Sequence, residues 1–243
     1  MLALCKCSLA PILLIQARRV RRTALRLPEP SGPRDGHFRA DSEDSLSVLF
    51  VGDSSAAGVG VSHQRDGLAL QTARRLCARL AVSVDWQLIA KSGVNTREAS
   101  ALLVGSRIRK ADVVITALGT NDVTSQQSAR AFIANYEALA NEIRSRSGAK
   151  AFVVTGLPPF HMLTAAPQPL RWYLGQYAKR LDDDLQRWCK ERPETSFLSL
   201  QWAAKPEEMA ADRYHPGKSQ YQRWSELVCE QIAGLLGKSG NPC

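Results

Sequence analysis

The sequence predicts an α/β protein in which a parallel β-sheet is covered by helices on both faces. Short apolar runs, typical of buried strands, alternate along the chain with longer segments whose apolar residues recur at helical spacing. Most strand runs are apolar throughout, which is typical of strands buried on both faces. The 243 residues are enough for one large α/β domain with a substantial core.

The first elements have clear boundaries. Val48–Val51 is a β-branched and aromatic run that ends at Gly52, so it predicts a buried strand. Apolar residues recur at helical spacing over 66–80, and they alternate over 82–89, which predicts a helix followed by a second strand.

The later elements continue this alternation. Asn95 followed by Glu98 is a capping-box pattern, and it predicts a helix that runs to about residue 107. A strand is expected over 151–157, where Pro158-Pro159 stops it. The remaining expected elements are the strands 113–118 and 195–200 and the helices 128–146, 170–189 and 219–236.

Four polar patches follow these strands or their adjoining loops. They are Gly52-Asp53-Ser54, Ser92-Gly93, Gly119-Thr120-Asn121-Asp122 and Asp212-Arg213-Tyr214-His215-Pro216. Because sites in parallel sheets lie beyond the carboxyl ends of the strands, we expect the patches to meet there.

Three residues of these patches suit nucleophilic catalysis. A serine hydroxyl is a poor nucleophile until a base removes its proton, so Ser54 needs a partner such as His215. Asp212, three residues before His215, is the candidate that would orient the imidazole and stabilise the imidazolium.

Three hydrogen-bond donors suit an oxyanion. The tetrahedral intermediate of ester hydrolysis carries a negative oxygen that needs preorganised donors. We expect these from the backbone N–H groups of Ser54 and Gly93 and from the side-chain amide of Asn121. Gly93 suits a close backbone approach because it has no Cβ.

On these residues the chain resembles the SGNH (GDSL-type) hydrolase family, named for a serine, a glycine, an asparagine and a histidine in separate blocks. Ser54, Gly93, Asn121 and His215 match them in order, within residues 46–236. The resemblance implies a flavodoxin-like three-layer α/β/α sandwich with a five-stranded parallel sheet. It also implies a Ser-His-Asp triad that hydrolyses esters without a metal or other cofactor. It favours Ser54 over Ser55 as the nucleophile.

Within that family the chain is most similar to bacterial lysophospholipase- and thioesterase-like members. We therefore expect a serine esterase of lipid acyl esters, lysophospholipids or small acyl esters. One alternative is a carbohydrate or cell-wall O-deacetylase on the same triad, and another is a non-catalytic membrane-associated binding domain. Ser55-Ala56-Ala57-Gly58 departs from the Leu-Thr or Ile-Thr of many members, which bears on the substrate. His161 lies in a loop where substrate contact is expected.

The amino-terminal segment differs from the rest in composition. We divide the chain into an arm, residues 1–28, a linker, 29–45, and a hydrolase domain, 46–238. The arm is apolar and then Arg-rich, and it carries six of the +9 net charges, so the body lacks the basic excess of a nucleic-acid-binding protein. Its apolar part is shorter than the ~20 residues of a spanning helix.

The order of apolar and basic residues in the arm is the reverse of a secretory signal. It favours contact with a membrane surface, with the body on the cytoplasmic side. An uncleaved or disordered leader is the alternative.

The six cysteines do not predict a disulfide framework, because a chain of this size has a hydrophobic core and does not need disulfide bonds for stability. Cys77 shares a helical face with Leu76 and Leu80, which predicts a buried free thiol. Cys5 and Cys7 have no nearby partners for a metal, and no stretch has the histidine and carboxylate spacing of a zinc site.

Overall fold

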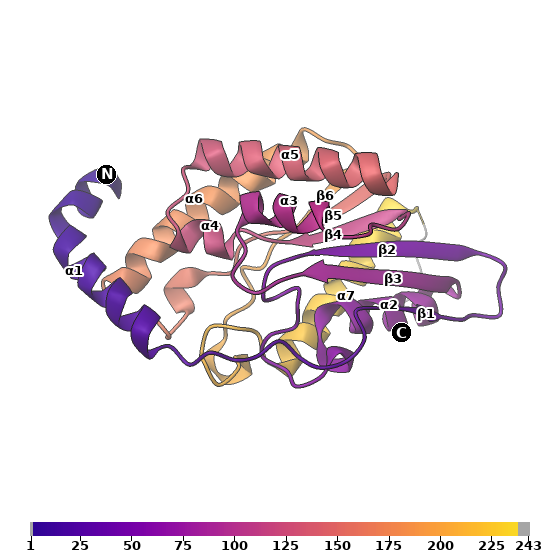
Figure 1. The fold of residues 1–243 in the computed structure, drawn as a ribbon, viewed down its shortest axis with the longest axis horizontal. Coiled ribbons are helices and arrows are strands. Elements are labelled where there is room, and N and C mark those ends of the chain that lie inside the picture. Colours follow the sequence, from indigo (N-terminus) through magenta and orange to yellow (C-terminus); the bar gives the residue numbers. More distant parts are fainter. Residues whose placement is uncertain (1, 238–243) are drawn as a thin grey trace.

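A six-stranded sheet lies between two layers of helices in the computed structural model, which describes residues 2–237 and side chains from residue 9 onward (Figure 1). The strands are β1 (Asp35–Phe38), β2 (Ser45–Gly52), β3 (Ser83–Ala90), β4 (Val113–Ala117), β5 (Ala151–Thr155) and β6 (Thr195–Leu198). The α-helices are α1 (Leu2–Thr23), α2 (Leu68–Leu80), α3 (Thr96–Val104), α4 (Thr120–Thr124), α5 (Ala129–Ser147), α6 (Leu170–Lys190) and α7 (Lys218–Leu235). Short 3₁₀ turns, η1 (Gln64–Asp66), η2 (Phe160–Met162) and η3 (Pro206–Glu208), lie in the loops.

The strand order in the sheet is β1-β3-β2-β4-β5-β6. The strands from β2 to β6 are parallel to one another, so the predicted α/β class and its five parallel strands are confirmed. The sheet also has a sixth strand, which the sequence did not predict. This strand, β1, pairs antiparallel with β3 and forms one edge of the sheet. This strand lies within the segment 29–45 that we interpreted as a linker. Its four residues, Asp-Gly-His-Phe, contain no apolar run. Besides the backbone pairing, His37 lies 3.1 Å from the Asp85 carboxylate of β3, and Phe38 packs against the core.

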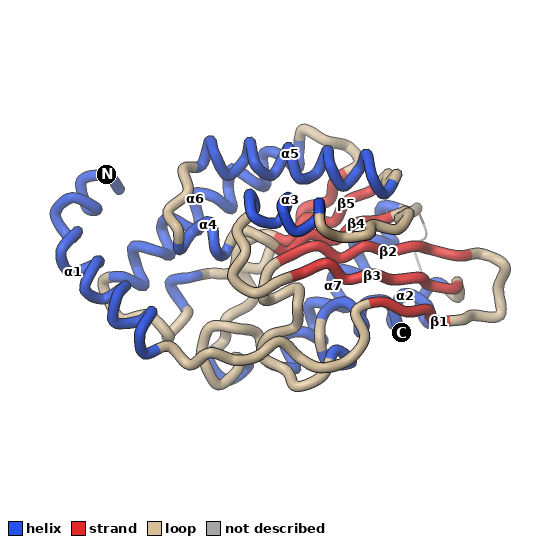
Figure 2. Tube along the Cα trace, in the orientation of Figure 1, coloured by secondary structure: helices blue, strands red, loops and turns tan. Residues whose placement is uncertain are grey.

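Helices cover both faces of the sheet (Figures 1 and 2). One cluster of buried side chains joins β2 to α3, α5 and α6, and a second joins it to α2 and α7. Neighbouring residues of β2 alternate between these clusters, with Leu49 and Val51 on one face and Val48 and Phe50 on the other. Burial of both faces explains why the strand is apolar at every position.

The predicted capping box at the start of α3 is confirmed. The Asn95 side chain accepts a hydrogen bond from the Glu98 N–H at 2.9 Å, and the Glu98 carboxylate accepts one from the Asn95 N–H at 2.9 Å. The helix ends at Val104 instead of near residue 107, because Gly105 caps it.

The carboxyl end of β2 lies very close to β4. A Cβ on Gly52 would stand 2.4 Å from the carbonyl oxygen of Ala117 and 2.4 Å from the Cβ of Ala56. Only glycine fits there. The chain therefore turns sharply after β2, above the end of β4.

The amino-terminal arm forms α1 and packs against the start of α6. Leu13 is buried with Leu170 and Tyr173. The Gln16 amide donates a hydrogen bond to the carbonyl of Gln168 at 2.7 Å, and its oxygen accepts one from the Leu170 N–H at 3.0 Å. The arm is thus a docked helix. No helix in the described part of the chain is long and apolar enough to cross a membrane.

Cys77, Cys189 and Cys229 are free thiols, and Cys77 is only partly buried. The side chains of Cys5 and Cys7, and all of Cys243, lie outside the described residues.

The boundary of the hydrolase domain at 46–238 stays a prediction.

Candidate active site

Ser54 lies in the turn that follows β2 and is almost completely buried. The Asp53 N–H donates to the carbonyl of Ala117 at 3.0 Å, which ties the turn to β4. The Asp53 carboxylate in turn accepts hydrogen bonds from the N–H and the hydroxyl of Ser55, at 3.0 and 2.7 Å. The nucleophile candidate is therefore held by the residues on both sides of it.

Ser54, His215 and Asp212 form one continuous chain of hydrogen bonds. The Ser54 Oγ lies 2.8 Å from His215 Nε2, and His215 Nδ1 lies 2.5 Å from an Asp212 carboxylate oxygen. Because an ionised carboxylate can only accept, Nδ1 carries the proton and Nε2 is free to accept the serine hydrogen. The hydrogen bond thus joins Ser54 and His215, which lie 161 positions apart in the sequence.

Asp212 is well placed to remain ionised. The backbone N–H groups of Tyr214 and His215 both donate to its other oxygen at 3.0 Å. Burial acts to raise the pKa of Asp212, but the hydrogen bonds from His215 and from the two backbone groups lower it below its ordinary value. A negative charge therefore faces the imidazole at neutral pH.

The loop that carries Asp212 and His215 is a tight turn. Arg213 adopts a left-handed conformation with a φ of 56°, which is unusual for a residue with a side chain. The Ala210 N–H donates to the carbonyl of His215 at 2.9 Å, and Met209 pairs with Pro216 in an isolated bridge. These contacts close the turn and bring the two side chains together.

The two predicted oxyanion-donor segments are joined to each other. The Asn121 amide donates to the carbonyl of Val94 at 2.9 Å, which leaves its second hydrogen available. The Asp122 carboxylate accepts from the N–H and the hydroxyl of Thr96, at 3.0 and 2.8 Å. The loop around Gly93 and the turn at Asn121 are therefore held in one fixed arrangement.

Two buried carboxyl groups support this arrangement. Burial, with a smaller contribution from the charge of Asp53, raises the pKa of Asp122 to about 6, although hydrogen bonds from Thr96 act to lower it. Burial also raises the pKa of Asp53. Each group has one oxygen without a hydrogen-bond partner in the described part of the chain. The Asp53 and Asp122 carboxyl groups hold their loops in place, and neither forms a hydrogen bond with His215.

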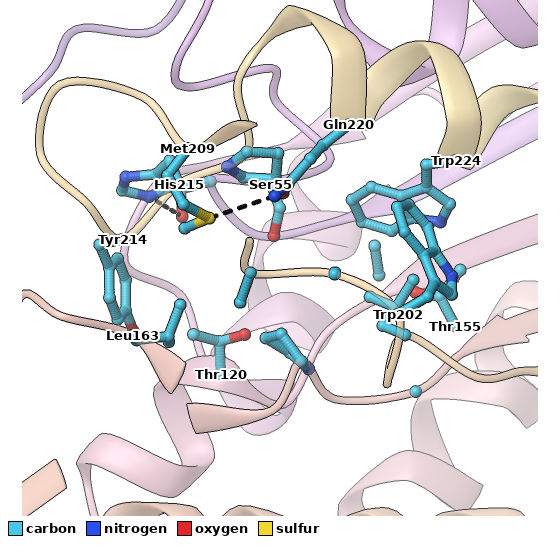
Figure 3. A pocket seen from close by; sticks show the side chains of 18 of the residues that line it. Ser55, Thr120, Thr155, Leu163, Trp202, Met209, Tyr214, His215, Gln220 and Trp224 are labelled. Carbon is cyan, nitrogen blue, oxygen red and sulfur yellow. Dashed lines mark hydrogen bonds between the residues drawn. The ribbon is translucent and has the colours of Figure 1, made fainter. Parts of the chain in front are cut away.

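A small, mostly apolar pocket opens beside Ser54 and His215 (Figure 3). Its cavity volume is about 40 Å³. Its lining includes Thr120 and Tyr214, which belong to the predicted patches but had no assigned role, and Leu163, Trp202, Met209 and Gln220, which lie outside those patches. Trp224 of α7 also lines it. Gly93 and Asn121 are not among the lining residues.

His161 does not line this pocket. It borders an adjacent groove together with Trp172 and Gln176, and Pro158 belongs to both. Its contact with a substrate stays a prediction.

Tyr214 belongs to the predicted patch 212–216 and directly precedes His215, but the sequence analysis gave it no role. Its ring lies edge-on to the His215 ring at 5.1 Å and to the Phe160 ring at 6.2 Å. It thus packs against the imidazole. Trp202 and Met209 come from the loop between β6 and α7, where no pattern in the sequence indicates a role.

Within residues 2–237, no cluster of histidine, cysteine and acidic side chains is arranged to hold a metal ion.

Comparison with known proteins gives a consistent result. Residues 50–223 match the model of the GDSL-like lipase/acylhydrolase family. A GDSL-like esterase of Mycobacterium tuberculosis is 27% identical in an alignment 206 residues long, which covers 79% of this chain and 63% of that protein. The chain thus spans less than two thirds of that relative.

Among solved structures, a lipase from a goat rumen metagenome aligns with a TM-score of 0.64 at 20% identity, over 78% of this chain and 98% of that one. A family 3 carbohydrate esterase of Clostridium thermocellum aligns with a TM-score of 0.59 at 17% identity, over 81% of this chain and 100% of that one. At these identities the likeness shows a shared fold.

Proposed function

The chain belongs to the GDSL-like lipase/acylhydrolase family, and we propose that it is a serine esterase that hydrolyses carboxylic esters with Ser54, His215 and Asp212. The observation that carries this proposal is the unbroken hydrogen-bonded chain from the serine hydroxyl to the carboxylate. A non-catalytic binding domain would have no need for such a chain at the edge of a pocket.

In the first half of the reaction, Ser54 Oγ attacks the ester carbonyl carbon while His215 Nε2 removes the hydroxyl proton. The negative charge on the carbonyl oxygen is stabilised by the N–H groups of Ser54 and Gly93 and by the free hydrogen of the Asn121 amide. Asp212 stabilises the imidazolium that forms.

In the second half, the imidazolium of His215 donates its proton to the leaving alcohol, and the acyl group remains on Ser54. Water then attacks the acyl-enzyme with His215 again as base, which releases the carboxylic acid and restores the hydroxyl.

Ser54→Ala tests the nucleophile. We expect a fluorophosphonate probe to label the wild type and not this variant, because the probe reacts only with an activated serine. Ser55→Ala is the matched control, since it removes the neighbouring hydroxyl and should keep the label. Mass spectrometry of the labelled protein measures both. Labelling that persists in Ser54→Ala would refute the assignment.

The size of the pocket favours a short acyl group. One buried water needs ~10–15 Å³ of such space, so about 40 Å³ accommodates a group of only a few atoms. Apolar side chains such as Leu163 and Met209 wall it, which suits a methyl or short alkyl group. Small acyl esters are therefore our first candidate substrates. A sugar O-deacetylase is the second candidate, since an acetyl group also fits.

A panel of p-nitrophenyl esters from acetate to palmitate tests the acyl group. We expect kcat/KM to be highest for the shortest esters and Leu163→Ala to move the optimum to longer ones, because it removes part of the wall. An optimum at palmitate in the wild type would contradict the short-chain proposal and favour lipid acyl esters. Complete inertness would favour the binding domain.

We also propose that α1 contacts a membrane surface. Its inner face is covered by α6, but Ile12, Leu14 and Ile15 point outward and are 48%, 58% and 66% exposed. The carboxy-terminal half of the helix carries Arg18, Arg19, Arg21 and Arg22 and no acid. Apolar residues followed by basic residues suit a bilayer with anionic headgroups. Each Arg near such a surface contributes ~1 kcal/mol to the free energy of binding.

Replacing Arg18, Arg19, Arg21 and Arg22 with glutamine should abolish co-sedimentation with vesicles that contain phosphatidylserine. Vesicles of phosphatidylcholine alone should bind neither protein well. The matched control removes four exposed cations of α6, at Lys179, Arg180, Arg187 and Lys190, and should keep the binding. Equal binding of the wild type and the α1 variant to the phosphatidylserine vesicles would contradict the proposal.

A further inference from the structure

We propose that Glu29 is a positioning residue for ester hydrolysis, because it fixes the loop that presents the Gly93 N–H to the oxyanion. This inference rests on the proposed function. Glu29 lies six residues after α1, outside the matched family region, and no block of the family pattern includes it.

Packing holds Val94, which is buried in the core beside α3 and α5, but it leaves the preceding residue, Gly93, open. Gly93 has a φ of +85°, and a Cβ built there would meet no atom within 4 Å. No side chain therefore packs against Gly93 itself, and hydrogen bonds to its neighbours help to fix the direction of its N–H.

Side chains of three residues from elsewhere in the described chain anchor residues 92–96. The Asn121 amide holds the carbonyl of Val94, and the Asp122 carboxylate holds Thr96, so both later anchors come from the Asn121 turn. The third is the Glu29 carboxylate, which accepts a hydrogen bond from the Ser92 N–H at 2.7 Å. Glu29 is the anchor nearest to Gly93 on the side that precedes it, and the next one upstream is the hydrogen bond of 3.2 Å from the Lys91 N–H to the carbonyl of Gly52.

Glu29 is itself held in place. Its second carboxylate oxygen lies 3.2 Å from the Arg34 guanidinium, and the Arg34 carbonyl accepts a hydrogen bond from the Leu88 N–H of β3 at 2.7 Å. We call residues 29–34 the strap; it runs from α1 past the loops at the carboxyl ends of the strands to β1 (Figure 2).

The strap also contacts the loop that follows the nucleophile. The Ser31 N–H donates to the carbonyl of Ser62 at 3.2 Å, and the Ser31 carbonyl accepts from the Gln64 N–H at 2.8 Å. The strap is thus attached both to β3 and to the loop that follows the nucleophile, and these contacts help to fix the position of Glu29.

A support of this kind acts mainly on the transition state. The oxyanion exists only after attack, so a displaced Gly93 N–H weakens the transition state and leaves the binding of the uncharged ester almost unchanged. Removal of one oxyanion donor costs ~10²–10³-fold in kcat, and a displaced donor should cost less.

We would test this with Glu29→Ala, Glu29→Gln and the control Asp35→Ala in the full chain. Asp35 is an acid close to the strap whose ion pair with Arg109 does not involve the Gly93 loop. We expect Glu29→Ala to lower kcat about tenfold on a short p-nitrophenyl ester, with KM changed by less than about twofold. Glu29→Gln keeps an oxygen acceptor at the same place and should restore most of kcat, and Asp35→Ala should match the wild type.

Hydrogen exchange of the backbone supplies a readout that does not depend on activity. The Ser92 amide should exchange faster in Glu29→Ala than in Glu29→Gln or the wild type, while the thermal midpoint of unfolding stays the same. Unchanged exchange at Ser92, or an equal loss of kcat in Asp35→Ala, would overturn the role of Glu29. A wild type that hydrolyses no ester and takes no fluorophosphonate would instead refute the proposed function, and the exchange result would still decide whether Glu29 anchors the loop.

Discussion

The hydrogen bonds around the Asp212 carboxylate are the interaction on which the site depends. One oxygen accepts two backbone N–H groups of its own loop, which fixes the turn, and the other accepts His215 Nδ1. The same group therefore shapes the loop and sets the tautomer of the histidine. Because Nδ1 is occupied, Nε2 faces Ser54 as an acceptor, and the serine becomes the only hydroxyl that this base can reach by a direct hydrogen bond in the described structure.

The sheet brings the remaining groups to the same place. The close approach of β2 and β4 at Gly52 forces a sharp turn before Ser54, and the buried carboxyl of Asp53 holds that turn. Asp122 does the same for the loop of Gly93 through Thr96. Burial raises the pKa of both carboxyl groups, and the charge of Asp53 adds a smaller increase to the pKa of Asp122.

Much of the fold and site could be predicted because the relevant signals are local. Continuous apolar runs identify strands buried on both faces, and the Asn95–Glu98 pair identifies the start of α3. Ser54 and His215 follow from the rule that sites lie beyond the carboxyl ends of parallel strands. The strand β1 and the Glu29 anchor could not be predicted, because each depends on backbone groups of a partner distant in the sequence. The pocket walls at Trp202 and Met209 depend in the same way on the course of a loop.

The central claim is that Ser54 and His215 act as one reacting unit, and the non-additivity of their removal tests it most directly. Single-turnover rates would be measured for Ser54→Ala, His215→Ala and the double variant on a short p-nitrophenyl ester. Each single change should abolish nearly all of the triad's rate enhancement, ~10⁶-fold in kcat, and the double variant should be no slower than either. Losses that multiply in the double variant would contradict the account, since they would mean that the two residues contribute independently.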